Sequence, residues 1–389
     1  MASAAPDLRP QIPLRPDSRP IAPRTISSGS RAAALAVWVA ASLLVLPLHA
    51  LALALTSGSL LVTDDGAKGV FEVRPAGVVV KVAKDTRLQH PFDAIVDVDG
   101  SLIVADRGAD TSATTTDGAI YRVSAATGMI SATLAKGAPL VNPTGLALEA
   151  SGDVIVIDPD AVVNGSNGHV FRWKRATGDL VPLSGCRRFN KPVRAVVEGG
   201  GDIVVIDSSA SSGALFRIDG ATGGCVTLLR GTKGETHGLV KPFGIALAAD
   251  GTIVLADEDA NPADLTSTTG AIFAYAFATN AVTRTVTDAA LIRPRGVAVD
   301  AAGNFLVADA LAKKIFAIAP DGTLTTKVTS PLFSSPVQVR IVGAAPPPAL
   351  GRSRVDFLVV DRGADPRGLG TVDGTGAVFG VDATTGLLS

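Results

Sequence analysis

Residues 294–309 read PRGVAVDAAGNFLVAD: a proline, an alternating apolar run, a glycine and a second apolar run that ends in aspartate. Alternation with a period of two is typical of half-buried β-strands, and a glycine between two such runs is typical of a hairpin turn. The stretch therefore predicts two short antiparallel strands. The same pattern recurs at 91–106, 143–158, 192–207 and 242–257.

Each unit continues with a third apolar strand, such as GAIYRV (118–123), and then with an outer strand, such as CVTLLRG (225–231). Four short antiparallel strands in a repeat of about 50 residues predict an all-β fold, a β-propeller. The aspartate that ends the second strand marks the repeat. It recurs as Asp64, Asp106, Asp158, Asp207, Asp257, Asp309 and Asp361.

The number of blades depends on which strand is counted. Second and third strands occur seven times, whereas first strands that begin with proline occur six times, the sixth at Pro336 followed by the insertion AAPPPALGRSR (344–354). Seven blades are favoured if residues 51–55, LALAL, supply the missing first strand; six blades are the alternative. Either ring should close by pairing N-terminal with C-terminal segments, because an open ring leaves bare sheet edges.

The repeat resembles the NHL-repeat β-propellers and their gluconolactonase-like relatives, most closely in PRGVAVDAAGNFLVADALAKKIFAIAPDG (294–322). The resemblance implies blades of four antiparallel strands. It also implies a range of roles, because such propellers include ligand-binding modules, lactonases and a lyase. The gluconolactonase-like enzymes hold a divalent metal in the channel with Glu and Asn side chains. No matching set is present at the first-strand positions here, where Glu149 and Glu198 come at the strand ends.

The N-terminal region differs from the repeats. Residues 1–31 are basic and rich in proline, which predicts disorder, and residues 32–55 contain no Asp, Glu, Lys or Arg. A basic lead, an apolar run and Ala-x-Ala sites predict a signal peptide over 32–54, and an uncleaved membrane anchor is the alternative. Both predict an exported protein, periplasmic, extracellular or at the cell surface, with the propeller over 55–389.

Long acidic loops after the second strands and basic residues before the first strands should share one face of the ring, the loop-rich face. The formal net charge of −1 gives no indication of nucleic-acid binding. Basic side chains at the start of three successive first strands should converge at the channel mouth, neutralised either by the acidic loops or by an anionic ligand. The candidate ligand-binding residues are Arg194, Lys241, Arg293, Arg295 and His237, with Lys191 beside them.

The metal candidate is the stretch DEDANPAD (257–264), in which Asp257, Asp259 and Asn261 alternate as oxygen ligands of Ca²⁺ would. No cofactor is required by any other motif. The seven repeat aspartates are interpreted as structural, because an aspartate at a strand end accepts backbone N–H bonds and shapes the next turn. The two cysteines, Cys186 and Cys225, are predicted to be free thiols at opposite faces of the ring.

These observations predict an exported, non-catalytic propeller that binds a small molecule or a protein partner on its loop-rich face. No complete catalytic motif is present. Two alternatives stay open: a metal-dependent hydrolase, such as a lactonase, or a lyase with its site in the central channel, and a structural envelope protein.

Overall fold

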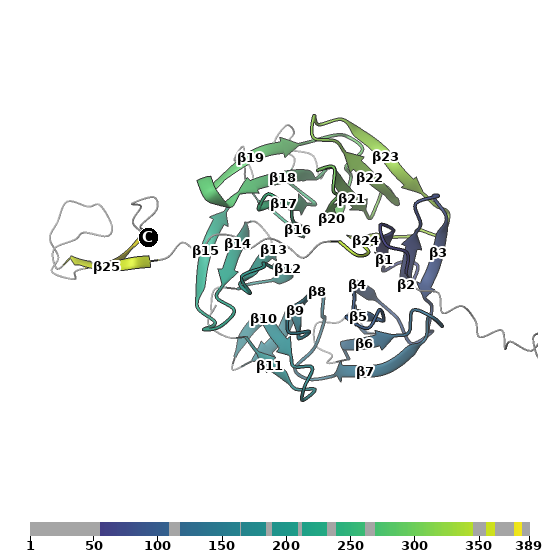
Figure 1. The fold of residues 1–389 in the computed structure, drawn as a ribbon, viewed down its shortest axis with the longest axis horizontal. Helices are drawn as coiled ribbons and strands as arrows, with labels where there is room; N and C mark the ends of the chain where they lie inside the picture. Colours follow the sequence, from purple (N-terminus) through teal and green to yellow (C-terminus); the bar gives the residue numbers. More distant parts are fainter. Residues whose placement is uncertain are drawn as a thin grey trace, which may run out of the picture. The chain divides into compact units, whose positions relative to one another are not determined.

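The computed structural model describes residues 55–344, except 109–116, 164, 184–188, 209–211, 232–238 and 261–268, together with the strands at 355–361 and 377–382. Six four-stranded antiparallel sheets stand around a central channel as the blades of a ring (Figure 1). The predicted all-β propeller with four-stranded blades is confirmed.

In each blade the first strand lies nearest the channel and the fourth lies on the outside (Figure 1). Blade 1 is β24 (Pro336–Ile341), β1 (Leu60–Asp64), β2 (Gly69–Val73) and β3 (Val79–Ala83); blade 2 is β4 (Pro91–Val96), β5 (Leu102–Asp106), β6 (Ala119–Val123) and β7 (Ile130–Lys136); blade 3 is β8 (Gly145–Leu148), β9 (Val154–Val163), β10 (Ser166–Trp173) and β11 (Leu180–Pro182); blade 4 is β12 (Pro192–Val197), β13 (Ile203–Ser208), β14 (Gly213–Ile218) and β15 (Cys225–Arg230); blade 5 is β16 (Pro242–Leu247), β17 (Thr252–Asp257), β18 (Ala271–Ala276) and β19 (Ala281–Val286), with the short helix η1 (Phe277–Thr279) between the last two; blade 6 is β20 (Pro294–Val299), β21 (Phe305–Asp309), β22 (Lys314–Ile318) and β23 (Leu324–Thr329).

The ring closes through blade 1, which combines the two ends of the repeat region. Strand β24 pairs with β1 in antiparallel register, so that Val339 lies opposite Val62. The sixth proline-led strand is therefore the inner strand of blade 1, and each of the six proline-led stretches supplies one blade. The expectation of seven blades is wrong, because the seventh pair of second and third strands, β25 (Val355–Asp361) and β26 (Ala377–Asp382), forms a separate two-stranded sheet.

The core lies between neighbouring blades. Six clusters of buried apolar side chains fill the six junctions of the ring. Blade 1 takes part in two of them: Leu61 packs with Leu102 of blade 2, and Val62 packs with Leu306 of blade 6. Second strands such as β5 and β21 are buried along their whole length and are apolar up to the terminal aspartate, whereas outer strands such as β7 and β23 are mostly half-buried or exposed.

The prediction of two free thiols is wrong for Cys225, which is disulfide-bonded; Cys186 lies outside the described residues. The physical reason lies in the path of the chain between blades 3 and 4. Leu183 and Phe189, on either side of the undescribed residues 184–188, pack against the same apolar cluster as Cys225. The prediction had placed residue 186 and Cys225 at opposite faces of the ring.

The predicted disordered region and the apolar segment 32–54 also lie outside the described residues. Of the predicted strand at 51–55, only Leu55 is described, and the edge of β1 that such a strand would fill pairs with β24. Within the described residues no helix is long and apolar enough to cross a bilayer.

Candidate functional site

The third residue of each proline-led stretch belongs to the wall of the channel. Three of these residues are glycines, and neighbouring inner strands approach closely there: a Cβ on Gly244 would lie 2.5 Å from the carbonyl oxygen of Arg295, and one on Gly296 would lie 2.5 Å from Cα of Gln338. Glycine at these positions leaves room for the larger side chains at the other three. The six residues in ring order are Asp93, Gly145, Arg194, Gly244, Gly296 and Gln338.

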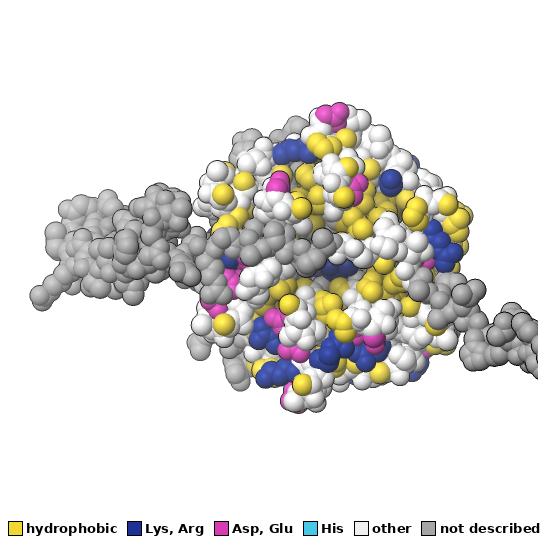
Figure 2. Space-filling view, in the orientation of Figure 1, with side chains coloured by type: hydrophobic (Ala, Val, Ile, Leu, Met, Phe, Trp, Pro, Cys, Tyr) yellow, Lys and Arg dark blue, Asp and Glu magenta, His cyan; other side chains and the backbone are white. Residues whose placement is uncertain are grey.

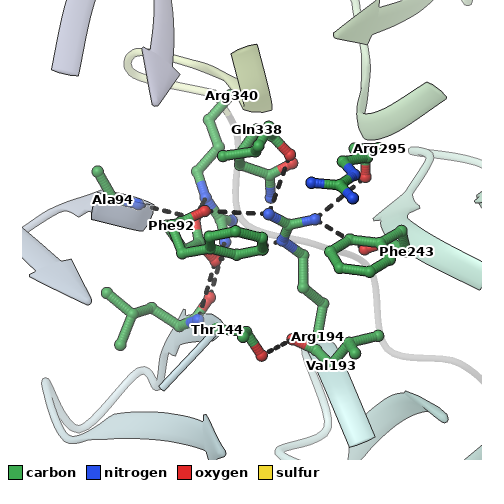
Figure 3. A network of polar contacts seen from close by, with 12 residues as sticks. Phe92, Ala94, Thr144, Val193, Arg194, Phe243, Arg295, Gln338 and Arg340 are labelled. Carbon is green, nitrogen blue, oxygen red and sulfur yellow. Dashed lines mark hydrogen bonds and ion pairs between the residues drawn. The ribbon is translucent and has the colours of Figure 1, made fainter. Parts of the chain in front are cut away.

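Arg194 uses this room and closes the channel. Its side chain is only 1% exposed, and its two terminal nitrogens donate to backbone carbonyl oxygens of four other inner strands (Figure 3). Nη1 lies 2.7 Å from Phe243 O and 3.1 Å from Arg295 O, whereas Nη2 lies 3.0 Å from both Phe92 O and Val337 O. One guanidinium therefore links β12 to β4, β16, β20 and β24.

Asp93 supplies the counter-charge on the axis. Its buried carboxylate accepts two hydrogen bonds from Arg340, at 3.1 and 2.8 Å, and one from the backbone N–H of Leu146 at 2.9 Å. Nε of Arg194 lies 3.9 Å from the same carboxylate and has no hydrogen bond. Burial lowers the pKa of Arg194 to about 10, which still leaves the guanidinium charged at neutral pH. Two guanidiniums thus share one carboxylate.

The mouth of the channel on the loop-rich face repeats this arrangement. Arg295 Nε lies 2.9 Å and Arg293 Nε 3.8 Å from Glu258 Oε2, so again two guanidiniums share one carboxylate. The side chain of Arg293 is 45% exposed and that of Arg295 is 17% exposed. The lysines of this rim have their own partners: Lys241 lies 3.2 Å from Asp259, and Lys191 lies 3.6 Å from Asp160.

Aromatic rings separate the two levels. Phe92 and Phe243 lie side by side with their centroids 5.8 Å apart, and the guanidinium of Arg194 lies within 5.7 Å of each ring. Arg107 and Arg295 each lie over one ring, 4.7 Å from the centroids of Phe92 and Phe243 respectively. Such contacts hold the guanidinium planes without consuming their N–H donors.

The structure thus brings Arg194, Arg293 and Arg295 together around the channel, with Lys241 and Lys191 on the rim. His237 lies outside the described residues. Sequence reasoning missed Asp93 and Arg340, and it missed Glu258 as the shared partner. The third residue of each proline-led stretch carried the signal for Asp93, because it is glycine in three of the six stretches and polar or charged in the other three.

The repeat aspartates form a common turn. Asp106 accepts hydrogen bonds from the backbone N–H groups of Gln89, His90 and Gly108, at 2.8, 3.2 and 2.8 Å. Burial raises the pKa of each described member above its usual value, against the lowering effect of these hydrogen bonds. The other members with backbone partners are Asp64, Asp158, Asp207, Asp257 and Asp309; the side chain of Asp361 lies outside the described residues.

Of the metal candidates, Asp257 is buried and accepts hydrogen bonds from the backbone N–H groups of Val240, Lys241 and Asp259. Asp259 pairs with Lys241, and Asn261 lies outside the described residues. Among the described residues no group of three or more His, Cys, Asp and Glu side chains could hold a metal ion.

The opposite end of the channel opens into a cavity of about 360 Å³. Aliphatic residues at the ends of inner strands line most of it, and Arg340 contributes the charged part of the wall. On the face shown in Figure 2, Lys and Arg side chains gather with Asp and Glu side chains over blades 2 and 3. These blades contain the ion pairs of Arg122 and Arg175 with Asp97, and of Arg172 with Glu149.

No protein-family model matches the chain, and no curated protein matches it. Solved structures do. In fold, the chain is similar to the virginiamycin B lyase and gluconolactonase propellers. The lyase, from Staphylococcus aureus, aligns with a TM-score of 0.48 at 14% identity over 70% of this chain and 82% of its own. A gluconolactonase from Xanthomonas campestris aligns with a TM-score of 0.44 at 16% identity over 61% of this chain and 74% of its own.

A protein of unknown function from Bacteroides caccae aligns with a TM-score of 0.52 at 11% identity, over 74% of this chain and all of that one. The predicted resemblance to gluconolactonase-like propellers is therefore confirmed as a likeness in fold. Because propellers of one architecture perform unrelated tasks, the likeness assigns no activity.

Proposed function

We propose that the protein is an exported, non-catalytic propeller that binds an acidic ligand on its loop-rich face, at the mouth of the channel. One observation carries the proposal: Glu258 is shared by Arg293 and Arg295. Because Glu258 carries a single negative charge, it compensates only one of the two guanidinium charges at the mouth. A carboxylate or phosphate of a ligand would complete the pairing, and the planar fork of arginine suits both.

The charges beneath the mouth act in the same direction. Arg194 and Arg340 share Asp93, so the axis also carries more guanidinium than carboxylate among these three groups. The buried location of Arg194 lowers the local dielectric screening, which strengthens its attraction for an anion above it. The charged patch on blades 2 and 3 differs from the channel mouth and supports the assignment by contrast. Besides Asp97, which Arg122 and Arg175 share, that patch contains a second carboxylate, Asp99. Hydrogen bonds from Ser101 and the charges of Arg122 and Arg175 lower the pKa of Asp99.

The test is calorimetric titration at low salt with a dicarboxylate, such as succinate, and with inorganic phosphate. The wild type is expected to bind, and Arg293→Ala/Arg295→Ala is expected to lose the binding heat. Glu258→Gln should do the opposite and bind more tightly, because it frees both guanidiniums. The matched control is Lys314→Ala/Lys327→Ala, which removes two charges from the outer half of blade 6. Equal heats from all four proteins would refute the proposed site.

Export is the second part of the proposal. It is supported by the basic and apolar pattern of residues 1–55 and by the disulfide at Cys225, because stable disulfides are uncommon in reducing compartments. Expression of the full chain in its native host, followed by fractionation and N-terminal sequencing, tests it. A mature N-terminus near residue 55 in an exported fraction is expected. An intact N-terminus in the membrane fraction would favour the anchor, and an intact N-terminus in the cytosol would contradict export.

A further inference from the structure

The hairpin β25–β26 corresponds to the second and third strands of a blade, but among the described strands it has no first or fourth strand beside it. In every complete blade the second and third strands lie between a first and a fourth strand, whereas β25 and β26 pair only with each other among the described strands. A two-stranded sheet alone is marginally stable in water, and its outer edges offer unpaired backbone groups to another strand. The hairpin is therefore expected to pair with the free edge of another strand.

The register of the hairpin shows which edge it fits. Asp361 lies opposite Ala377 and Val359 lies opposite Phe379, as Asp106 lies opposite Ala119 and Val104 opposite Tyr121 in blade 2. The sequences agree as well, since DRGAD occurs at both 106–110 and 361–365. The hairpin thus repeats the register of the middle of a blade and the DRGAD sequence that follows its second strand.

The edge that such a copy would normally use is that of the first strand immediately before it in the chain, which is β24. In blade 2 the first and second strands, β4 and β5, are joined by residues 97–101, and in blade 6 β20 and β21 are joined by residues 300–304. Residues 342–354 join β24 to β25, which is more than a hairpin turn needs. In the structure that edge of β24 is occupied by β1, with Val62 opposite Val339 and Asp64 opposite Pro336.

We propose that β25–β26 competes with β1–β2 for the edge of β24 in the same chain. In the exchanged state β24, β25 and β26 form a consecutive blade, with Val359 opposite Val339 and Asp361 opposite Pro336. The exchange replaces one terminal aspartate with another. In the structure, Asp64 accepts hydrogen bonds from the backbone N–H groups of Ser334 and Ser335, both at 2.8 Å. Asp361 occupies the same register position in β25 as Asp64 in β1.

The exchange would change the loop-rich face. Strands β1 and β2 are joined by the short turn 65–68, whereas β25 and β26 are joined by residues 362–376, which begin with the second RGAD sequence. Blade 1 is the neighbour of blade 2, with which it shares an apolar cluster. Exchange would therefore place the two DRGAD sequences on adjacent blades. It would change which residues the loop-rich face presents to a ligand, while the ring keeps six blades.

Cysteine cross-linking in the full chain tests the proposal. Val62→Cys/Val339→Cys reports the pairing seen in the structure, and Val339→Cys/Val359→Cys reports the exchanged pairing. After slow oxidation and alkylation, bridges are located by peptide mass mapping, which separates them from the native disulfide. Both bridges are expected within single chains, the 62–339 bridge in greater yield.

Weakening β1 should shift the ratio. Leu61→Ala removes a buried contact of β1, so it should raise the yield of the 339–359 bridge by more than about tenfold relative to the unexchanged state. The matched control is Ile155→Ala, at the equivalent position of β9, which lies in the apolar cluster of blades 3 and 4 and should leave the ratio unchanged. If Leu61→Ala does not fold, the 339–359 pair in the unmodified background remains decisive. The absence of a 339–359 bridge, or its formation only between two chains, would overturn the proposal.

Discussion

Arg340 of β24 donates two hydrogen bonds to the buried carboxylate of Asp93 in β4, at 3.1 and 2.8 Å. The two residues are 247 positions apart in the chain. The pair joins β24, the inner strand of blade 1, to β4 of blade 2. Arg194 approaches the same carboxylate from β12. Asp93 therefore links the closing strand to blade 2 and also balances charge in the channel.

Asp93→Asn should destabilise the protein strongly. The substitution removes the charge shared by Arg194 and Arg340 and turns an amide N–H₂ group toward a guanidinium, and breaking a buried ion pair in this way costs about 3–5 kcal/mol. Urea unfolding measures the loss. Asp321→Asn is the control, since the exposed Asp321 accepts a turn hydrogen bond from Thr323 that asparagine can also accept. Similar midpoints for both variants would contradict the role of Asp93.

The ionisation of Asp257 should make stability fall with rising pH. Burial raises the pKa of this carboxyl to about 7, despite hydrogen bonds from Asp259, Lys241 and Val240. Between the unfolded value of 3.8 and about 7 the folded state binds more protons, so the free energy of unfolding falls by up to about 1.4 kcal/mol per pH unit. The substitution Asp257→Asn removes this pH-dependent contribution to the free energy of unfolding. The difference in unfolding free energy, wild type minus variant, should decline over that range; a flat or rising difference would contradict the assignment.

Gly296→Ala should cost about 1–3 kcal/mol, because an added Cβ would lie 2.5 Å from Cα of Gln338 and would force two inner strands apart. The control is Gly224→Ala, where the nearest atom is Thr222 Oγ1 at 3.3 Å. Thermal unfolding of both variants gives the comparison. If Gly296→Ala melts with the wild type, the inner strands do not pack as closely as described.

Cys225 should react with iodoacetamide only after reduction, because it is disulfide-bonded. Reduction, or the substitution Cys225→Ser, should lower the free energy of unfolding by about 2–4 kcal/mol. Intact mass after alkylation of the native and the reduced protein provides the measurement. Alkylation of Cys225 without reductant would restore the original prediction of a free thiol.

Calcium should leave the melting temperature unchanged. Asp257 already accepts three backbone hydrogen bonds and Asp259 pairs with Lys241, so a cation at these residues and Asn261 would have to displace the lysine. Scanning calorimetry with calcium and with a chelator tests this expectation. A ligand present at 100 times its dissociation constant stabilises by about 2.7 kcal/mol. A rise that calcium produces in the wild type but not in Asp259→Asn would instead establish the metal site.

The fold was largely predictable from the sequence because its signals are local. Proline, alternating strand, glycine turn and terminal aspartate recur in register, and each described repeat aspartate binds backbone N–H groups as expected for a turn. The blade number was not predictable from the count of second strands. Pairing of β24 with β1 instead of β25 is a choice between two similar edges, and local pattern does not distinguish them.

The site was predictable in part for the same reason. Proline-led strands place Arg194, Arg293 and Arg295 at the channel, and the structure has them there. Their partner was less accessible, because Glu258 follows β17 in blade 5, whereas Arg293 and Arg295 lie at the start of β20 in blade 6. The depth of Arg194 depends on glycines of two other strands, Gly244 and Gly296, which sequence spacing alone does not bring together.

The pairing of β1 with β24 also sets the order of events during synthesis. Asp64 and Ser335, which it bonds, are 271 residues apart, and at 5–20 residues per second their synthesis is separated by tens of seconds, about 14–54 s. Throughout that time β1 has left the ribosome with one edge unpaired, and the ring cannot close. The nascent chain therefore passes through an open intermediate with five complete blades and three of the four strands of blade 1, and protection of the free edge of β1 in that interval limits how much of the protein reaches its final form.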